Sequence, residues 1–156
     1  MEYEKVLFEV LQDTILYIVS KMQDKVNINR KYLQKIMFLV NYYDPERNTL
    51  TTTHKSFNIY FVIYYYGPFS FEVSDAIIEL INKGLLKEDL NGSIKLAKDV
   101  NVDLVDIIKD RVDKILEKFG EKSSKELVDI SLELLGIKDV KEFLGNPVEV
   151  IIEEKD

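Results

Sequence analysis

The stretch YYYGPFSFEVSDAIIELINKGLL, residues 64–86, sets three tyrosines against a Gly-Pro pair and then continues as an amphipathic segment. We predict a helix over 71–83, because the hydroxyl oxygen of Ser70 can accept a free N–H of its first turn. Gly84 is typical of the position just after a helix ends. Residues with helical spacing are expected to form the inner face, namely Val73, Ala76, Ile77, Leu80 and Ile81.

The residues after Gly84 predict a β-hairpin. Two short strand-forming segments, LLKEDL (85–90) and SIKLA (93–97), flank Asn91-Gly92. Asn-Gly favours a two-residue turn, because both residues tolerate the positive φ that this turn requires. A hairpin directly after a third helix is typical of winged-helix proteins.

The segments before the tyrosines predict two more helices and one strand. Apolar residues recur with helical spacing over 5–22 and over about 29–43, and Asn27 or Asn29 can cap the second helix. A polar loop follows, and FNIYFVIYYY (57–66) then favours a short buried strand. A buried helical turn is the alternative for 57–66, since its hydrophobic residues are nearly continuous.

The charge is distributed unevenly along a chain of net charge −7. Residues 1–98 hold 12 basic and 12 acidic side chains, whereas residues 99–156 hold 9 and 16. This shift predicts a boundary near Val100. We therefore expect a helix-rich α+β protein, with a winged-helix-type module of three helices and a hairpin over 1–98. An acidic helical extension is expected over 99–156.

The acidic extension is predicted to begin with a helix over about 102–119. Its apolar residues form a narrow seam, Val105, Ile108, Val112, Ile115 and Phe119. Two heptads are short for an independent coiled coil, which favours packing on the module and leaves a homodimer interface as the alternative. Ser123 and Glu126 fit a capping box. A short helix near Asp139 and a closing strand over VEVII (148–152) are expected to follow.

Two stretches together resemble a known family. KYLQKIMFLVNYY (31–43) and FVIYYYGPFSFEVSDAIIELINKGLL (61–86) are similar to the Panacea or SocA-like antitoxin domain and related uncharacterised bacterial and archaeal winged-helix-type proteins. That family combines an L-Q-K-hydrophobic helix, an aromatic-Y-G-P motif, and a helix that ends in Gly before a hydrophobic pair. The resemblance covers about residues 30–90 and implies a non-catalytic regulator, which in some members neutralises a toxin. The matching positions are Leu33, Gln34, Lys35, Tyr66, Gly67, Pro68, Val73, Leu80, Gly84 and Leu85.

Aromatic residues are concentrated between residues 57 and 71. There are eight of them, Phe57, Tyr60, Phe61, Tyr64, Tyr65, Tyr66, Phe69 and Phe71. One interpretation is a stacking platform for unpaired bases, but such platforms place Lys or Arg among the rings, and this stretch contains neither. Core packing between the first helices and the third is therefore favoured. Gly67-Pro68 is expected to end whatever element precedes it.

Charge disfavours binding of duplex DNA by the third helix. Its predicted outward positions are Phe71, Glu72, Asp75, Ile78, Glu79 and Asn82, whose three carboxylates would be repelled by phosphates. The hairpin adds Lys87 and Lys95, which Glu88 and Asp89 offset. A basic cluster at the junction of the first two helices is the better candidate for phosphate or nucleic acid, and it comprises Lys21, Lys25, Arg30, Lys31 and Lys35.

Motifs for catalysis or for a cofactor are missing from the sequence. It contains no cysteine and a single histidine, His54, which lies in a Thr-rich loop. We find no nucleophile elbow, phosphate-binding glycine loop or H-E-x-x-H motif, so we expect no enzyme, no cofactor and no metal. The acidic start and the lack of a long apolar run predict a cytoplasmic protein without a membrane span. The Ile-, Lys- and Glu-rich composition is typical of thermophiles or AT-rich genomes.

The outward residues of the third helix predict the partner. Carboxylates beside the exposed apolar groups Phe71 and Ile78 suit a basic protein, because the apolar groups supply area and the charges supply complementarity. We expect a non-catalytic regulatory protein, antitoxin-like or adaptor-like, that binds another protein, with a basic toxin-like protein as one form of partner. The alternative is a DNA-binding winged-helix transcriptional regulator that dimerises through the acidic extension.

Overall fold

The computed structural model describes the backbone of residues 2–155 and the side chains of residues 7–155. The described chain is a helix-rich α+β structure with three two-stranded antiparallel hairpins. Its helices are α1 (Glu2–Met22), α2 (Arg30–Tyr42), α3 (Phe71–Asn82), α4 (Asp106–Phe119), α5 (Ser124–Leu135), the 3-10 helix η1 (Val140–Phe143) and α6 (Val148–Lys155). Its strands are β1 (Tyr43–Asp44), β2 (Thr49–Leu50), β3 (Val62–Tyr64), β4 (Gly67–Phe69), β5 (Leu86–Glu88) and β6 (Ile94–Leu96).

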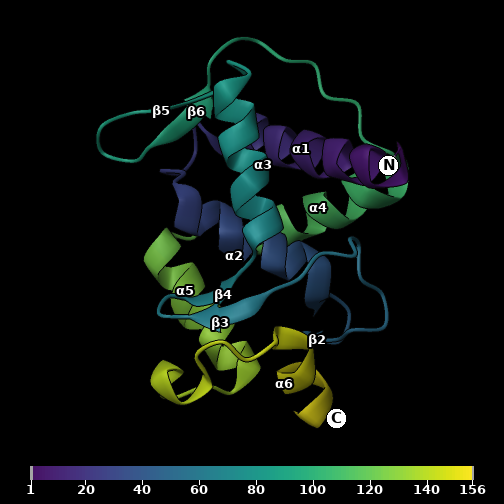
Figure 1. The fold of residues 1–156 in the computed structure, drawn as a ribbon, viewed down its shortest axis with the longest axis vertical. Coiled ribbons are helices and arrows are strands. Elements are labelled where there is room, and N and C mark those ends of the chain that lie inside the picture. Colours follow the sequence, from purple (N-terminus) through teal and green to yellow (C-terminus); the bar gives the residue numbers. More distant parts are fainter. Residues whose placement is uncertain (1, 156) are drawn as a thin grey trace.

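Helix α2 lies at the centre of the molecule (Figure 1). Every residue from Tyr32 to Tyr42 is buried, because α3, α4 and α5 all pack against this helix. Helix α1 packs against α3 and α4. The hydrophobic core joins residues from before and after Val100, so the acidic extension shares one core with the preceding segment.

The predicted helix starts follow from local capping. The side chain of Asn29 accepts the N–H of Tyr32 at 2.8 Å, and the hydroxyl of Ser70 accepts the N–H of Val73 at 3.2 Å. Ser123 and Glu126 form the expected capping box, and α5 ends at Gly136 with a φ of 71°. These interactions satisfy backbone groups that a helix end leaves free.

The predicted strand over 57–66 is shorter in the structure. Only 62–64 form a strand, which pairs with 67–69 across a two-residue turn at Tyr65 and Tyr66. Gly67-Pro68 therefore belongs to β4 and does not end the preceding element. Residues 57–61 remain outside the strand because side chains and a distant segment satisfy several of their backbone groups: the N–H of Val148, for example, donates to the carbonyl of Phe61.

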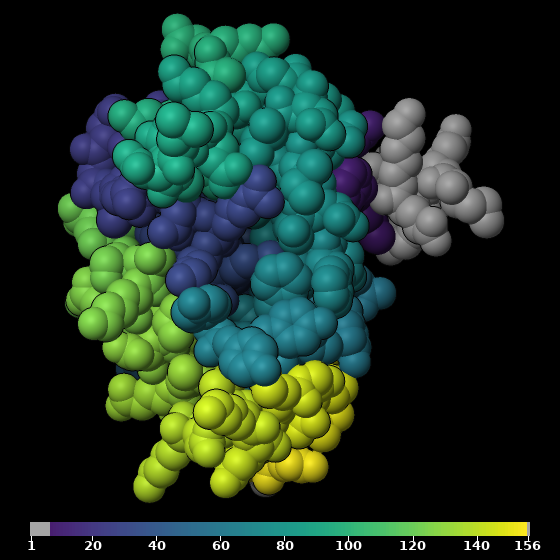
Figure 2. Space-filling model, turned by 60° about the vertical axis from the view of Figure 1, so that its left-hand side comes forward, coloured from purple at the N-terminus to yellow at the C-terminus, as the bar shows by residue number. Residues whose placement is uncertain are grey.

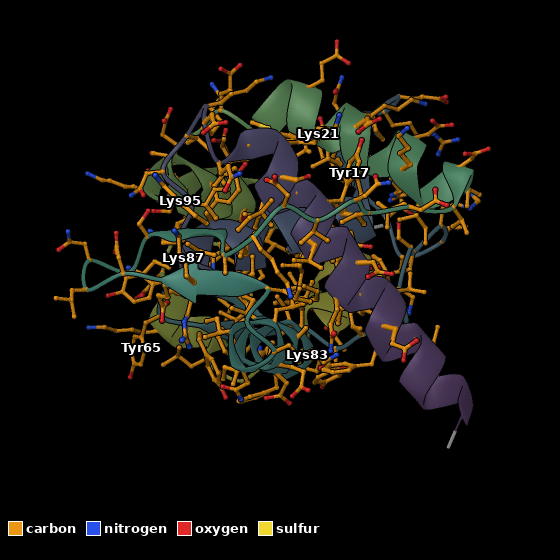
Figure 3. All side chains as sticks on the ribbon, turned by 90° about the horizontal axis from the view of Figure 1, so that it is seen from above. Tyr17, Lys21, Tyr65, Lys83, Lys87 and Lys95 are labelled. Carbon is orange, nitrogen blue, oxygen red and sulfur yellow. The ribbon has the colours of Figure 1, made fainter. Side chains whose placement is uncertain are left out.

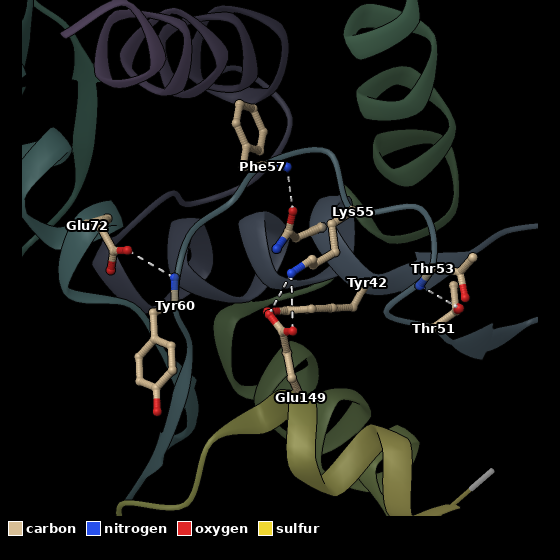
Figure 4. Close-up of polar contacts among 9 residues, drawn as sticks. Tyr42, Thr51, Thr53, Lys55, Phe57, Tyr60, Glu72 and Glu149 are labelled. Atoms are coloured by element: carbon tan, nitrogen blue, oxygen red, sulfur yellow. Dashed lines mark hydrogen bonds and ion pairs between the residues drawn. The ribbon is translucent and has the colours of Figure 1, made fainter. Parts of the chain in front are cut away.

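Figure 4 shows how the segment before β3 is held. The N–H of Phe57 donates to the side chain of Asn41 at 2.7 Å, and the N–H of Tyr60 donates to Glu72 at 3.0 Å. Lys55 forms an ion pair with Glu149 of α6 at 3.1 Å. The segment is thus attached to α2, α3 and α6 by side chains.

The hairpin after α3 is confirmed, but its turn differs from the prediction. Leu86 pairs with Leu96 and Glu88 with Ile94, so 89–93 form a five-residue loop. The carboxylate of Asp89 accepts the N–H groups of Asn91 and Ser93, both at 2.9 Å. Of these loop residues Gly92 alone has a positive φ, of 84°. The Asx-type bonds of Asp89 therefore replace the two-residue turn.

Two expectations for the acidic extension are corrected. Helix α4 begins at Asp106, four residues later than predicted, so Val105 is exposed, whereas Val112, Ile115 and Phe119 are buried. The stretch 148–152 is helical, and its buried residues Val148, Ile151 and Ile152 follow helical spacing. Among the described helices, none combines the length and the apolar character needed to cross a membrane.

Candidate functional site

A pocket of about 610 Å³ opens between α2, the β3–β4 hairpin and α3. Figure 2 shows it as a hollow bordered by the dark blue α2, the blue 64–66 turn and the teal α3. We name it the tyrosine pocket. Its lining residues are Arg30, Lys31, Gln34 and Lys35 from α2, Tyr64, Tyr65, Tyr66, Gly67 and Phe69 from the hairpin, and Ser74 and Ile77 from α3.

The expectation that the aromatic stretch mainly fills the core is wrong. Phe57 and Phe61 are buried, but Tyr65 and Tyr66 are 66% and 56% exposed, and Tyr60, Tyr64 and Phe71 are exposed as well. Tyr64, Tyr65 and Tyr66 are exposed at the end of β3 and in the turn to β4, and Tyr60 and Phe71 lie just before and just after this hairpin. Phe69, half-buried, links this surface to the interior.

Helix α2 supplies the positive charge that the aromatic stretch lacks. The ammonium of Lys31 lies 3.5 Å from the centroid of the Tyr66 ring, well within the range of a cation–π contact. No Lys or Arg occurs within residues 57–71. The fold nevertheless brings a cation to this aromatic surface, because Lys31, 35 positions before Tyr66 in the chain, lies on the adjacent helix α2.

Lys35 is buried in the wall of the tyrosine pocket. Its side chain is 2% exposed, and its ammonium donates one hydrogen bond, at 2.9 Å, to the carbonyl oxygen of Pro68. Among residues 7–155, no carboxylate forms an ion pair with it. Burial, assisted by the nearby charge of Lys31, lowers the pKa of Lys35 to about 7. Lys35 therefore lies in a pocket wall and not on an outer surface shared with Lys21 and Lys25, where the backbone of a nucleic acid would lie.

Gln34 joins α2 to the start of α3. Its side-chain oxygen accepts the N–H of Ser70 at 2.8 Å, and its side-chain nitrogen donates to the carbonyl of Ser70 at 2.9 Å. Both residues are buried. The L-Q-K and Y-G-P motifs therefore form one contact region, in which Gln34 holds Ser70 and Lys35 holds Pro68.

The predicted partner-binding residues of α3 differ in availability. Phe71 and Ile78 are 55% and 40% exposed, Asp75 and Asn82 are exposed, and Glu79 is half-buried. Glu72 is already engaged, since it accepts the N–H of Tyr60 and the hydroxyl of Ser70. Phe71 also packs edge-on against Phe69, at 5.3 Å between ring centroids.

The predicted basic cluster does not form one surface. Figure 3 shows Lys21 beside Tyr17, well apart from Tyr65, and its ammonium is 5.5 Å from the Tyr17 ring centroid. Lys25 is exposed and does not line the pocket. Arg30 forms an ion pair with Glu88 at 2.7 Å, which lowers the pKa of that carboxyl. Lys31 and Lys35 are the cluster members that line the tyrosine pocket without an ion pair to a described carboxylate.

His54 lies at a second, more polar pocket of about 780 Å³ between residues 44–54 and α4. Arg111 lines it, but its guanidinium already donates to the carbonyls of Val40 and Tyr43. Among the described residues, no three His, Asp or Glu side chains are grouped to hold a metal ion.

Comparisons with protein-family models, with the curated proteins and with solved structures found no match. The resemblance of residues 30–90 stays a prediction. Sequence reasoning assigned Gln34, Lys35 and Gly67 to a structural motif but missed the pocket that they line. One signal was present in the sequence: the polar pair Gln34-Lys35 directly precedes the continuous apolar run of residues 36–40.

Proposed function

We propose that the protein is a non-catalytic regulatory protein that acts by binding another protein. The observation that carries this proposal is the exposed aromatic surface of Tyr64, Phe69 and Phe71. Their ring centroids lie 5.3 to 6.0 Å apart, and Phe71 and Tyr64 remain exposed. Aromatic residues are enriched at the centres of protein interfaces, where their burial contributes most of the affinity.

The chemistry of the neighbouring residues favours a basic partner. Ile78 adds apolar area on α3, and Asp75 and Glu79 supply carboxylates beside it. An acidic rim around an apolar centre speeds association with a positively charged protein. The resemblance of residues 30–90 to antitoxin domains agrees with an antitoxin-like or adaptor-like role.

We also propose that α1, α2, α3 and the β5–β6 hairpin form a winged-helix-type arrangement. The order of these elements supports the assignment, as does the packing of the hairpin on α1 and α3. The N–H of Ile94 donates to the carbonyl of Ile28 at 2.8 Å, which attaches the hairpin to the chain just before α2.

Affinity capture with matched variants tests the proposed interface. Wild-type protein, Phe71→Asp, Ile78→Asp and the control Ile107→Asp serve as baits, after circular dichroism has shown that all are folded. Ile107 is a suitable control because it is 80% exposed and lies on α4.

A partner recovered by wild type is then purified, and its affinity for each variant is measured directly. We expect Phe71→Asp and Ile78→Asp to weaken binding about tenfold or more, and Ile107→Asp to leave it unchanged. Equal affinity for all four proteins would reject this interface.

A DNA-binding regulator is the second candidate. It is favoured by one observation: Lys87 and Lys95 are exposed and directly opposite each other across the hairpin, so both lie on one face. Figure 3 shows the two side by side on the hairpin. The carboxylates of α3 would oppose phosphate, and we therefore place this function second.

A further inference from the structure

The tyrosine pocket holds positive charge that the described protein does not balance. Lys35 in its wall and Lys31 at its rim form no ion pair with any carboxylate of residues 7–155, although the chain as a whole carries a net charge of −7. An ammonium has three N–H groups, and Lys35 uses one of them on Pro68. A buried charge without a partner is costly, so this site favours either a neutral amine or an anion beside it.

No carboxylate of the described residues lines the pocket beside Lys35. Arg30 and Lys31 are the charged residues of α2 that line the pocket, and Arg30 is already paired with Glu88. From α3 the pocket is lined by the neutral residues Ser74 and Ile77, and α5 brings Leu132 close to Gly67. The hairpin contributes the three phenols of 64–66. Burial is the main cause of the lowered pKa of Lys35, and among residues 7–155 Lys31 is the charged side chain that adds to it.

The shape and the walls of the pocket suit a flat organic group. A volume of about 610 Å³ lies within the range of small-molecule sites, which is roughly 300–1,000 Å³. The rings of Tyr64, Tyr65 and Tyr66 are exposed at its edge and can stack on a planar ligand. Gly67 also lines the pocket, and a Cβ added there would lie 3.9 Å from Cε of Lys35.

We propose that the tyrosine pocket binds a small planar organic anion, whose ring stacks on the tyrosines of 64–66 and whose acidic group accepts hydrogen bonds from Lys35 and Lys31. The acidic group is a carboxylate or a phosphate, since both accept charge-assisted hydrogen bonds from ammonium groups. The pocket adjoins the proposed protein interface, since Tyr64 and Phe69 belong to both. Phe71 and Ile78 do not line the pocket, so their variants test the interface without removing a group of the pocket.

Isothermal titration calorimetry with three matched probes tests the charge requirement. The probes are 2-naphthoate, 2-naphthyl phosphate and the neutral 2-naphthamide, which share one ring system. We expect at least one anion to bind about tenfold or more tightly than the amide, because the amide cannot pair with the ammonium groups. The stronger of the two anions identifies the acidic group that the site prefers.

Lysine variants locate the binding site. Lys35→Met and Lys31→Met each remove one ammonium while keeping an unbranched apolar side chain, and Lys109→Met removes an exposed lysine of α4 as the matched control. We expect both pocket variants to lose the preference for the anion over the amide, and Lys109→Met to retain it. If Lys35→Met does not fold, Lys31→Met alone still tests the proposal, since Lys31 is exposed.

Proton uptake on binding distinguishes the proposed site from nonspecific apolar binding of the naphthyl ring, which would not change the protonation of Lys35. At pH 8.5 Lys35 is mostly neutral in the free protein, because its pKa is lowered to about 7. An anion beside it favours the ammonium, so binding should take up protons, to a limit of about one per ligand bound. Titrations in two buffers of different ionisation enthalpy measure this number, and Lys35→Met should reduce it to near zero.

Three results would overturn the proposal. The first is that neither anion binds at millimolar concentration. The second is that 2-naphthamide binds as tightly as both anions, which would make the pocket a plain apolar site. The third is that Lys31→Met and Lys35→Met, both folded, bind the anions like wild type and with the same proton uptake.

Discussion

The ammonium of Lys35 donates a hydrogen bond of 2.9 Å to the carbonyl oxygen of Pro68, which lies 33 positions later in the chain. This bond connects the middle of α2 to β4, next to the two bonds between Gln34 and Ser70. Pro68 has no N–H of its own, so its carbonyl is its one backbone group for hydrogen bonding. The contact gives the buried ammonium a hydrogen-bond partner. Burial, with the nearby charge of Lys31, lowers the pKa of Lys35 and thereby makes the stability of the protein dependent on pH.

We predict that Lys35 makes the folded state more stable as the pH rises from 7 towards 9.5. Its pKa is about 7 in the folded protein and 10.5 in its ordinary state, so the unfolded chain binds more protons in this window. Stability should rise by at most about 1.4 kcal/mol per pH unit. Chemical unfolding of wild type and Lys35→Met at a series of pH values measures the effect as their difference.

Subtracting the free energy of unfolding of Lys35→Met from that of wild type also removes the pH dependence that other titratable groups give to both proteins. The pKa of Tyr17 is raised to about 12, chiefly by burial and then by its bond to Asp113, which lowers stability above pH 10 in both proteins. The wild-type minus Lys35→Met difference should be flat below pH 7 and increase above it. A constant difference from pH 6 to 9.5 would show that Lys35 titrates normally.

Removing Gln34 should destabilise the fold strongly. Gln34→Leu replaces the amide by an apolar side chain of similar size and leaves the buried N–H of Ser70 without its partner. The carbonyl of Ser70 loses the bond from Gln34 but keeps the one from the N–H of Ser74. Since one unsatisfied buried group costs about 1–3 kcal/mol, we expect a loss of about 1–3 kcal/mol in the free energy of unfolding. Urea unfolding checks this, with Asn82→Ala, an exposed change on α3, expected to stay within about 0.5 kcal/mol. If Gln34→Leu and Asn82→Ala lose similar amounts of unfolding free energy, the bonds between Gln34 and Ser70 contribute little to stability.

Gly67 is predicted to be required for its backbone conformation. Its φ is 91°, and an added Cβ would meet the side chain of Leu132 at an ordinary contact distance of 3.6 Å. Backbone strain is therefore the expected penalty, and Gly67→Val should cost about 1 kcal/mol or more. Gly67→Asn should cost less, because Asn tolerates positive φ better than a β-branched residue. Thermal unfolding that ranks Asn and Val equally would point to crowding by Leu132.

The DNA-binding alternative makes its own prediction for the hairpin. If β5–β6 contacts phosphates, the double variant Lys87→Glu with Lys95→Glu should abolish binding, and Lys109→Glu should preserve it. Fluorescence anisotropy with a labelled duplex, from about 50 to 200 mM salt, should then show a steep loss of affinity. Wild-type protein that leaves the duplex unbound at the lowest salt would eliminate this function.

Local sequence signals predicted most helices of the structure. Asn29, Ser70 and Ser123 each cap a helix through a bond to a residue three positions later. These interactions lie within one turn, so they depend little on the rest of the chain. The order of three helices and a hairpin followed from the same signals, since periodicity and turn residues are also local.

The errors fall where distant residues decide the conformation. VEVII has the β-branched composition of a strand, yet 148–152 are helical because Val148, Ile151 and Ile152 bury one helical face in the core. Propensity is a weak preference that such packing overrides. The strand over 57–66 was shortened in the same way, by bonds from Asn41 and Glu72 to the backbone of the segment.

The sequence by itself determined the helix-rich α+β class, the caps, the hairpin after α3 and the acidic character of residues 99–156. The tertiary structure alone decided which aromatic rings are exposed and which cations meet them. Lys31 and Tyr66 are 35 positions apart, and no local pattern predicts that the ammonium of one lies over the ring of the other. A pocket exists where separate elements leave space between them, and that depends on how α2, α3 and the β3–β4 hairpin pack.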